Sequence, residues 1–419
     1  MLKGVVMVKI ANIASFCFFI IVVFIAGCIQ IDESEERYED TRDKMDTYVS
    51  IILYSSDEAT ANEAIEAAYK RIDEIVEIAN RFNGSSEISQ LNSNEILKSP
   101  SPELVDMLEI SVKYNSITNG AFDITIPPLL DLWSLSSSSS PYYLFNMSQS
   151  FIYNLDSGNI TDDIKLVFSG HEYTLNETPT VNSNNASMQW TVKSGWLDFV
   201  VKMESDVLNV YTEFFWNINY SKQEEYINTT KKYVGSEKIT ISDDEIRLEK
   251  GMSLTLDGIA KGFAVDEALE ILKDMGIKSA LINAGGDIAT YGIKPDGGNW
   301  VTGLRNPDDA NESIMEFDLS GEAIATSGNY ERYFNESAKI GHILDPTSGR
   351  SVTLCSSSTI IADNCTVADI LATAVFVLGP IDGVNLVDSL PGVETIVLDY
   401  DDPQNLFYSS NLTDFKIQV

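Results

Sequence analysis

One stretch, Met252 to Asp287, limits the possible folds more than any other, because loop, helix, turn, strand and loop follow one another directly in its pattern. Apolar residues recur at helical spacing from Ala264 to Met275, Asp266 faces elsewhere, and Gly276 stands where a left-handed helix cap belongs. The apolar run from Ser279 to Ile282 has the length of a buried strand. The stretch therefore predicts a helix followed closely by a strand of a sheet.

Both ends of this unit have the chemistry of an anion site. At the helix start, Gly258, Ala260 and Gly262 leave the backbone open to a ligand, and Lys261 adds a cation. Free N–H groups and the positive end of the helix dipole attract phosphate at such a start. After the strand, Asn283-Ala284-Gly285-Gly286-Asp287 predicts a tight turn that carries a carboxylate. Glycines before a helix are more often packing devices, so packing and phosphate binding both stay open.

The charge of the chain excludes one class of function. Its 419 residues include 28 basic and 63 acidic side chains, which give a net charge of −35. A nucleic-acid binder needs a basic face for the phosphate backbone, and this chain cannot easily assemble one. Nucleic acid is therefore not expected among its partners. The length allows one large domain or two ordinary ones.

The N-terminus has the pattern of an export signal, residues 1–28. Lys3 and Lys9 form a basic start, and the apolar run from Ile10 to Ile25 is short for a membrane span. Ala26-Gly27-Cys28 closes the segment and resembles a lipobox, in which Cys28 is lipidated and becomes the mature N-terminus. An uncleaved N-terminal anchor is the alternative. Both interpretations tether the protein to the exterior face of the cell membrane.

Residues 29–46 separate this signal from the first predicted strand. From Ile31 to Asp46 they are acidic and almost free of apolar side chains. Such a segment buries too little surface to offset the entropy of ordering it. We therefore expect a flexible stalk here, with folding beginning near Thr47. The main domain is then predicted to cover residues 47–134 and 222–419.

Two amphipathic helices are predicted next, Ala59 to Asn80 and Pro102 to Thr118, from the spacing of their apolar residues. The sequence between them, Arg81 to Asn92, predicts a turn followed by a capped helical turn. After the second helix comes Gly120-Ala121-Phe122-Asp123, which leads into an apolar segment ending at Trp133. By composition alone, that segment is an aromatic cluster with a capping aspartate.

A change of composition marks residues 135–221 as an insertion. The segment begins with a serine run and is rich in Asn, Ser, Thr and Tyr, and alternating stretches such as Ile164 to Phe168 predict strands. We interpret it as an inserted, largely β module of unknown role. Asn-x-Ser/Thr triplets, which are acceptors for N-glycosylation, recur in and around it, as in an exported glycoprotein.

Two further segments could contact an anion. Trp300 to Pro307 predicts a strand that carries Arg305 near its end, where the side chain could hold a phosphate or an acidic neighbour. Ala323 to Arg332 contains Thr326 and Ser327, which offer hydroxyl and backbone N–H groups to a ligand.

The loop from Gly341 to Gly349 contains His342, one of the two histidines in the chain, close to an Asp345-Pro346 turn. Histidine changes charge near neutral pH, so His342 could contact a ligand or move a proton. A lone loop histidine is also commonly structural.

A helix predicted from Val367 to about Leu378, with Thr366 as its cap, presents two hard oxygen ligands. Asp369 and Thr373 stand four residues apart and therefore share one face. A carboxylate and a hydroxyl one turn apart suit Mg²⁺, which leaves its other coordination positions to phosphates and water. A local hydrogen bond between the two side chains is the alternative.

Two cysteines, Cys355 and Cys365, remain once Cys17 and Cys28 are assigned to the signal segment. A strand predicted from Ser357 to Ala362 would hold their Cα atoms too far apart for a disulfide. We expect two free, packed thiols.

These motifs together resemble those of the ApbE family, the FAD:protein FMN transferases. In the central unit, Gly258-Ile259-Ala260-Lys261-Gly262 and Asn283 to Asp287 resemble Gly-Ile-Ala-Lys-Gly and Asn-x-Gly-Gly-Asp of the family. Two departures stand out, since the carboxylate of Asp257 is displaced by two residues from its usual place and Asn329 replaces an aspartate. The other matching segments are residues 86–92, 120–123, 303–307, 325–332, 342–349 and 368–374.

The resemblance implies an α/β (α+β) domain related to the T-fold, with a mixed sheet-and-helix core and the large insertion. It implies Mg²⁺-dependent transfer of FMN from FAD to a threonine or serine hydroxyl of a target flavoprotein, with release of AMP. The implied acceptor is an exterior flavin-bearing subunit of a membrane electron-transfer complex.

The resemblance also implies site residues. The implied Mg²⁺ ligands are the Ala260 carbonyl, Asp369 and Thr373, and the implied catalytic residues are His342, Asp345 and Asp287. The implied flavin-binding residues are Asn92, Phe122, Asp123, Lys261, Gly285, Gly286, Asp287, Arg305, Thr326, Ser327 and His342. Two alternative functions stay open: an FAD pyrophosphatase that gives FMN and AMP, and a surface-binding lipoprotein that is not an enzyme.

Overall fold

The computed structural model describes residues 35–417 apart from thirteen gaps, at 135–152, 155–158, 161–163, 169–170, 176–179, 182–186, 195–196, 206–209, 219–222, 307–311, 329–332, 336–339 and 403–404. The predicted signal segment and Cys28 lie outside the described residues, and so does Asn329.

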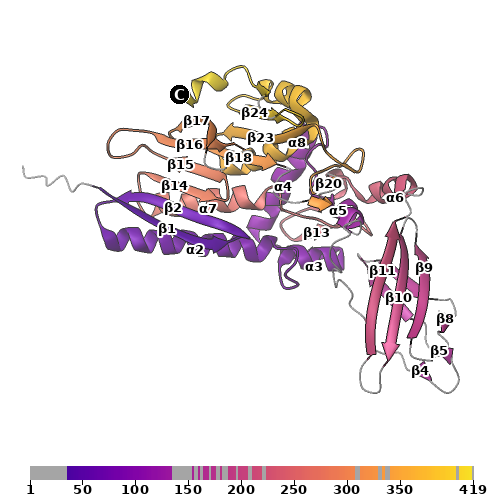
Figure 1. Ribbon diagram of the computed structural model, residues 1–419. Coiled ribbons are helices and arrows are strands. Elements are labelled where there is room, and N and C mark those ends of the chain that lie inside the picture. The colour runs from indigo at the N-terminus through magenta and orange to yellow at the C-terminus, as the bar shows by residue number, and fades with distance from the viewer. Residues whose placement is uncertain are drawn as a thin grey trace, which may run out of the picture.

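An eight-stranded antiparallel sheet forms the centre of the fold (Figure 1). Its strand order is β1-β2-β14-β15-β18-β23-β24-β25, so β2 pairs on one side with β1 and on the other with β14, which follows more than 200 residues later. The expected α/β architecture is confirmed. The strands are β1 Glu36–Lys44, β2 Thr47–Ser55, β14 Ala280–Ala284, β15 Asp287–Tyr291, β18 Ala323–Gly328, β23 Cys355–Ala362, β24 Glu394–Asp399 and β25 Leu406–Tyr408.

Helices α2, α7 and α8 share one core with one face of this sheet. In α2 the apolar side chains recur at helical spacing and are buried, and Asp57 caps its start by accepting a hydrogen bond from the Thr60 N–H at 2.7 Å. The predicted helices are present, and most of their ends lie within one or two residues of the predicted positions. The helices are α2 Glu58–Ala79, α3 Glu87–Asn94, α4 Pro102–Ile117, α5 Pro127–Ser134, α6 Gln223–Thr230, α7 Ala260–Asp274 and α8 Cys365–Asp388.

Helix α8 differs from its prediction at both ends. Asn364, not Thr366, is the N-cap, and its side chain accepts a hydrogen bond from the Val367 N–H at 2.9 Å. The helix also runs ten residues beyond Leu378, to Asp388, across a break at Gly379, where φ is 78° and Pro380 follows. Among the described residues, α8 is the one helix long and apolar enough to cross a membrane, but it lies largely buried in the core.

A second core lies on the opposite face of the main sheet. A three-stranded sheet covers that face, and Trp300 and Phe317 from it pack with Leu281 and Ile324 of the main sheet. The strands of this sheet are β16 Trp300–Arg305, β17 Ser313–Leu319 and β26 Lys416–Ile417. The remaining short strands outside residues 135–221 are β3 Ile96–Lys98, β12 Thr240–Ile241, β13 Glu245–Arg247, β19 Tyr333–Asn335, β20 Ile340–Gly341, β21 Leu344–Asp345 and β22 Arg350–Ser351.

The described backbone between residues 135 and 221 consists of strands, as the alternating pattern predicts. Four of them form an antiparallel sheet in the order β11-β10-β9-β8, which Figure 1 draws next to α6 and apart from the main sheet. The strands are β4 Tyr153–Asn154, β5 Asn159–Ile160, β6 Ile164–Phe168, β7 His171–Leu175, β8 Thr180–Val181, β9 Ser187–Ser194, β10 Leu197–Ser205 and β11 Val210–Ile218.

The prediction of a flexible stalk over residues 29–46 is wrong where the structure can test it. Residues Glu36–Lys44 form β1, the edge strand of the main sheet, which pairs with β2 along its whole length. The fold therefore begins at least eleven residues before Thr47.

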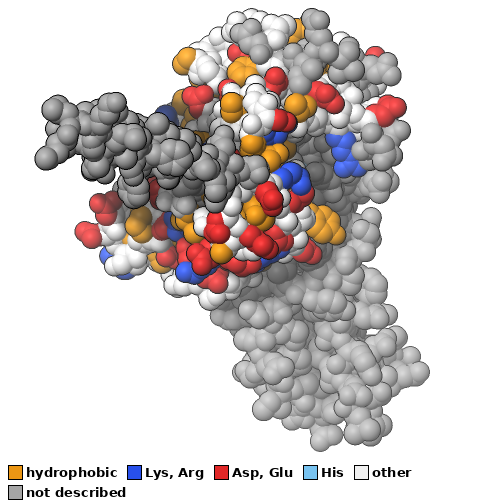
Figure 2. Space-filling model, turned by 90° about the vertical axis from the view of Figure 1, so that its left-hand side faces the viewer, with side chains coloured by type: hydrophobic (Ala, Val, Ile, Leu, Met, Phe, Trp, Pro, Cys, Tyr) orange, Lys and Arg blue, Asp and Glu red, His pale blue; other side chains and the backbone are white. Residues whose placement is uncertain are grey.

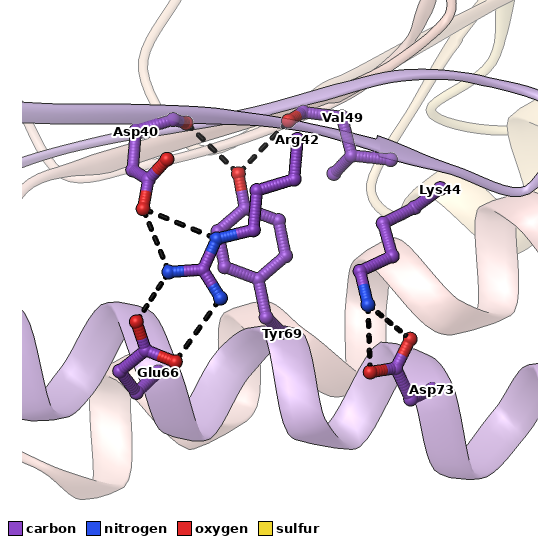
Figure 3. A network of polar contacts seen from close by, with 7 residues as sticks. All are labelled: Asp40, Arg42, Lys44, Val49, Glu66, Tyr69 and Asp73. Atoms are coloured by element: carbon purple, nitrogen blue, oxygen red, sulfur yellow. Dashed lines mark hydrogen bonds and ion pairs between the residues drawn. The ribbon is translucent and has the colours of Figure 1, made fainter.

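β1 is ordered despite its acidic composition because its basic side chains form ion pairs with carboxylates of α2, as Figure 3 shows. The Arg42 guanidinium contacts Asp40 at 2.7 Å and also the carboxylate of Glu66, and Lys44 lies 2.8 Å from Asp73. The Tyr69 hydroxyl lies 2.9 Å from the backbone carbonyl of Asp40, and the Arg42 guanidinium stacks 4.1 Å above the Tyr69 ring. Composition alone did not reveal this neutralisation.

The two described cysteines are free and buried, which confirms the expectation. Cys355 begins β23 and Cys365 begins α8. Burial raises the pKa of the Cys355 thiol to about 12 and holds the pKa of Cys365 well above its usual value. Both thiols are therefore protonated and unreactive at neutral pH.

Candidate functional site

Helices α7 and α8 touch at Gly262, and this contact brings the main candidate residues together. A Cβ atom at Gly262 would lie 2.4 Å from the carbonyl oxygen of Cys365 and 2.9 Å from the Cβ of Asp369, so no larger residue fits. The Gly262 N–H donates a hydrogen bond to Oδ2 of Asp369 at 3.1 Å. This glycine therefore serves close packing and also offers a backbone donor to a carboxylate.

Asp369 is 5% exposed. Burial, and after it the negative charge of Asp287, raise the pKa of its carboxyl group to about 7, although Lys261 and the Gly262 N–H oppose the shift. A carboxylate at this depth needs a compensating positive charge to stay ionised. The position thus suits a bound cation.

Two hydroxyl groups and an aromatic ring lie beside it. Thr373 Oγ1 is 3.3 Å from Oγ of Ser327, which belongs to β18. A Cβ atom at Gly258 would be 3.3 Å from Thr373 Oγ1 and 3.1 Å from the Phe122 ring. Four residues that the sequence analysis selected separately therefore meet at the start of α7.

Lys261 and Asp287 join the two ends of the 252–287 unit. The Lys261 ammonium lies 2.7 Å from Oδ2 of Asp287, whose side chain is 2% exposed. The turn before Asp287 uses the left-handed conformation of Gly285 and Gly286, with φ of 64° and 103°. The structure thus pairs the cation at the helix start with the carboxylate of the turn, a contact that the sequence analysis did not predict.

The donor set fits Mg²⁺. Asp369 and Thr373 supply hard oxygen atoms one helical turn apart, and the carbonyl of Ala260 belongs to the same short segment as Gly262. Over the described ranges, no group of three or more His, Cys, Asp or Glu side chains that could hold a metal occurs. A cation here would thus take few protein ligands and leave positions for phosphate oxygens and water.

Two predicted flavin contacts have structural partners within the chain. Asn92 donates to the Leu254 carbonyl at 2.9 Å and accepts from the Leu254 N–H at 2.7 Å, which ties α3 to the loop before α7. Asp123 accepts hydrogen bonds from the hydroxyls of Thr125 and Ser236, the latter at 2.7 Å. These bonds hold the loops that frame the site.

The loop of His342 and Asp345 is held from two sides. His342 is partly buried, and the Asp345 carboxylate accepts the N–H groups of Thr347 at 2.8 Å and Ser348 at 3.1 Å. The indole N–H of Trp133 donates to the carbonyl of Gly349 at 2.7 Å. The carboxylate of Asp345 thus shapes its own turn, and α5, which leads into residues 135–221, anchors the end of that turn.

Two other candidates point elsewhere. Arg305 is exposed at the end of β16, in the sheet that covers the face opposite α7 and α8. Thr326 Oγ1 lies 2.8 Å from Oγ1 of Thr359 on the neighbouring strand β23. The described structure therefore gathers Ser327, Thr373 and Asp369, but not Arg305, around the start of α7.

Sequence reasoning missed Asp266, which it placed on the outer side of its helix. The side chain is largely buried and accepts hydrogen bonds from the N–H groups of Cys365 and Thr366, both at 2.8 Å. The signal that could have revealed it is its spacing, since Asp266 follows Gly262 by four residues and so shares a face with it.

Fold and site together define an α/β protein with a cation- and phosphate-compatible site between two helices and one sheet edge. The sequence model of the ApbE family matches residues 45–165 and 185–397. The chain therefore belongs to the ApbE family, and with that it is an enzyme of the transferase class.

Similar proteins agree with this membership. The chain is 22% identical over 400 residues to the FAD:protein FMN transferase of Vibrio cholerae, covering 94% of this chain and 96% of the relative. The crystal structure of the ApbE protein from Thermotoga maritima superposes with a TM-score of 0.65 at 24% identity, covering 91% of this chain and all of that one. The flavin transferase ApbE from Vibrio cholerae superposes with a TM-score of 0.62 at 20% identity, over 91% of this chain and 99% of that one. These two structures share the fold.

Proposed function

We propose that the protein transfers FMN from FAD to a threonine or serine hydroxyl of an acceptor flavoprotein, and that the transfer depends on Mg²⁺. The observation that carries this proposal is the buried carboxylate of Asp369, next to the Thr373 and Ser327 hydroxyls and the backbone of Gly262. The site lacks enough positive charge to compensate the Asp369 carboxylate. A divalent cation bound to a pyrophosphate would supply it. The similarity to FAD:protein FMN transferases supports the same substrate.

In the proposed reaction, the acceptor oxygen forms a bond to the FMN phosphorus and the bond to the AMP oxygen breaks. Mg²⁺, when bound, neutralises the pyrophosphate and helps to align the displacement. Asp369, Thr373 and the Ala260 carbonyl are its proposed ligands. Lys261, held by Asp287, provides a fixed positive charge at the same helix start. The hydroxyl proton passes to a base, for which His342 is our candidate.

We further propose that Cys28 is lipidated and tethers the enzyme to the exterior face of the cell membrane. Because β1 begins at Glu36, the connecting segment is residues 29–35. Fully extended, such a segment reaches about 25 Å, at up to about 3.6 Å per residue. The domain then lies close to the membrane, where an electron-transfer complex would present its flavin-bearing subunit.

The test is to incubate the purified protein with FAD, Mg²⁺ and an acceptor domain that carries one target threonine. Our proposal requires a covalently fluorescent acceptor and release of AMP, with no labelling of a Thr→Ala acceptor. Free FMN without a labelled acceptor would instead identify a pyrophosphatase. Binding of FAD without turnover would point to a protein that is not an enzyme.

A further inference from the structure

Asp266 lies in α7, four residues beyond Gly262. Its carboxylate accepts hydrogen bonds from the first turn of α8. Oδ1 accepts the N–H of Cys365 at 2.8 Å, and Oδ2 accepts the N–H of Thr366 at 2.8 Å and also the Thr366 hydroxyl. Three donors at the start of one helix therefore converge on a single side chain of another.

Together with Asn364, this contact completes the cap of α8. The first N–H groups of a helix have no partner within it and must find one elsewhere. Asn364 accepts from Val367 at 2.9 Å, while Asp266 takes the two residues before Val367. A negative charge at a helix N-terminus is also favourable, because of the helix dipole.

The same two helices carry the candidate metal ligands. Gly262 lets α8 approach closely and donates its N–H to Asp369, which belongs to the second turn of α8. Asp266 holds the first turn. α7 therefore contacts α8 at two points, Gly262 and Asp266. These two contacts fix the position of Asp369 and Thr373 relative to the carbonyl of Ala260.

We propose that Asp266 is a positioning residue for the metal site: it holds α8 in the register that brings Asp369 and Thr373 to the start of α7. The inference rests on the proposed function, because it takes these two side chains and Ala260 as cation ligands. Burial raises the pKa of Asp266, while the hydrogen bonds from Thr366 and Cys365 favour its ionised form.

The substitution Asp266→Asn tests this role with little change of volume. It replaces one acceptor oxygen by an amide NH₂ group that faces a backbone donor, so one of the two backbone hydrogen bonds from α8 to this side chain is lost. Side chains that orient metal ligands typically affect metal affinity by about 10- to 100-fold. We expect Asp266→Asn to weaken Mn²⁺ binding by about that factor, measured by electron paramagnetic resonance titration of the purified protein without FAD.

A matched control is Glu87→Gln. Glu87 also accepts a backbone N–H and a hydroxyl at a helix start, both from Ser101 at 2.9 Å, but it connects α3 to α4. We expect Glu87→Gln to lower thermal stability and to leave Mn²⁺ affinity within about twofold of wild type, because it does not touch α7 or α8 in this contact. Equal weakening by both variants would overturn the positioning role.

A milder variant covers the case in which Asp266→Asn does not fold. Thr366→Val removes the hydroxyl bond and keeps the two backbone bonds, so Mn²⁺ affinity should fall by a smaller factor in the same direction. Wild-type affinity in the folded variants would overturn the inference while leaving the proposed function intact. Absence of Mn²⁺ binding by the wild-type protein would overturn the metal site, and the positioning role with it.

Discussion

Two acidic regions of this protein use the same side chains in opposite ways. At the edge of the sheet, the carboxylates of Asp40, Glu66 and Asp73 are partly or well exposed, and each lies within ion-pair distance of Arg42 or Lys44. Between α7 and α8, Asp369 is buried and its hydrogen bond from Gly262 does not neutralise its charge. In the first region, basic side chains of the chain itself neutralise the carboxylates. In the second region, a bound cation would have to do so.

The difference shows that acidic composition has no single structural meaning. Figure 2 shows acidic side chains gathered over the lower part of the coloured surface, at the height of α2 and β1 in Figure 1. In β1 and α2, Arg42 and Lys44 pair with acidic neighbours. Exposed pairs of this kind contribute little stability each. A buried carboxylate without full compensation is costly and is therefore the better indicator of a functional site.

The largest expected effect is at the buried carboxylate. Asp369→Ala should lower FMN transfer on the order of 100-fold or more, because a bound cation contributes several kcal/mol of charge stabilisation. Thr373→Val removes a neutral ligand and should have a smaller effect that excess Mg²⁺ partly reverses. The measurement is the initial rate of acceptor labelling at several Mg²⁺ concentrations. Wild-type rates in both variants would remove the metal assignment.

This comparison also explains what the sequence could predict. The shared face of Asp369 and Thr373 is predictable because a helix places positions four apart on the same side, and both residues do lie in α8. Helix α2 was found from its apolar spacing. Local patterns of this kind can be predicted from the sequence, because they depend only on the geometry of one helix or strand.

The edge strand was missed because the side chains that neutralise its charges belong to another element, α2. Tyr38, Asp40, Arg42 and Lys44 alternate along β1 and are the less exposed positions, and the pairing with β2 and the contacts with α2 order the strand together. Asp266 was missed for the same reason, since its donors at the start of α8 lie 99 and 100 residues away.

The second prediction concerns removal of β1. A chain that starts at Thr47 should unfold at a clearly lower temperature than one that starts at Glu35, because β2 loses a partner strand along nine residues. At about 0.5–1.5 kcal/mol for each hydrogen bond lost, the total is several kcal/mol. Thermal unfolding by circular dichroism measures it. Equal unfolding temperatures would restore the idea of a stalk.

The third prediction uses the pKa of Asp369, which burial raises to about 7. Since an unfolded aspartate has a pKa of about 3.9, the folded protein retains the proton between these values. The group therefore stabilises the metal-free fold at low pH, and this contribution is lost as pH rises from about 4 through 7. With EDTA, wild-type stability should decline over this window more than that of Asp369→Asn, and Mg²⁺ should restore it above about pH 7. Parallel pH profiles of the two proteins would contradict the assignment.

The smallest expected effect separates two arginines of β1. Arg42 bridges Asp40 and Glu66 and stacks on Tyr69, whereas Arg37 pairs with Glu39 on the same strand, where both side chains are more than 40% exposed. Arg42→Ala should cost about 1–2 kcal/mol, because a stacked cation and a shared ion pair are lost together. Arg37→Ala should change stability by less than about 0.5 kcal/mol. Urea unfolding of both variants compares them, and neither should alter FMN transfer, because β1 supplies no proposed ligand. Equal costs would mean that the contacts with α2 add nothing beyond the pairing of β1 with β2, and the edge strand would then owe its order to the sheet alone.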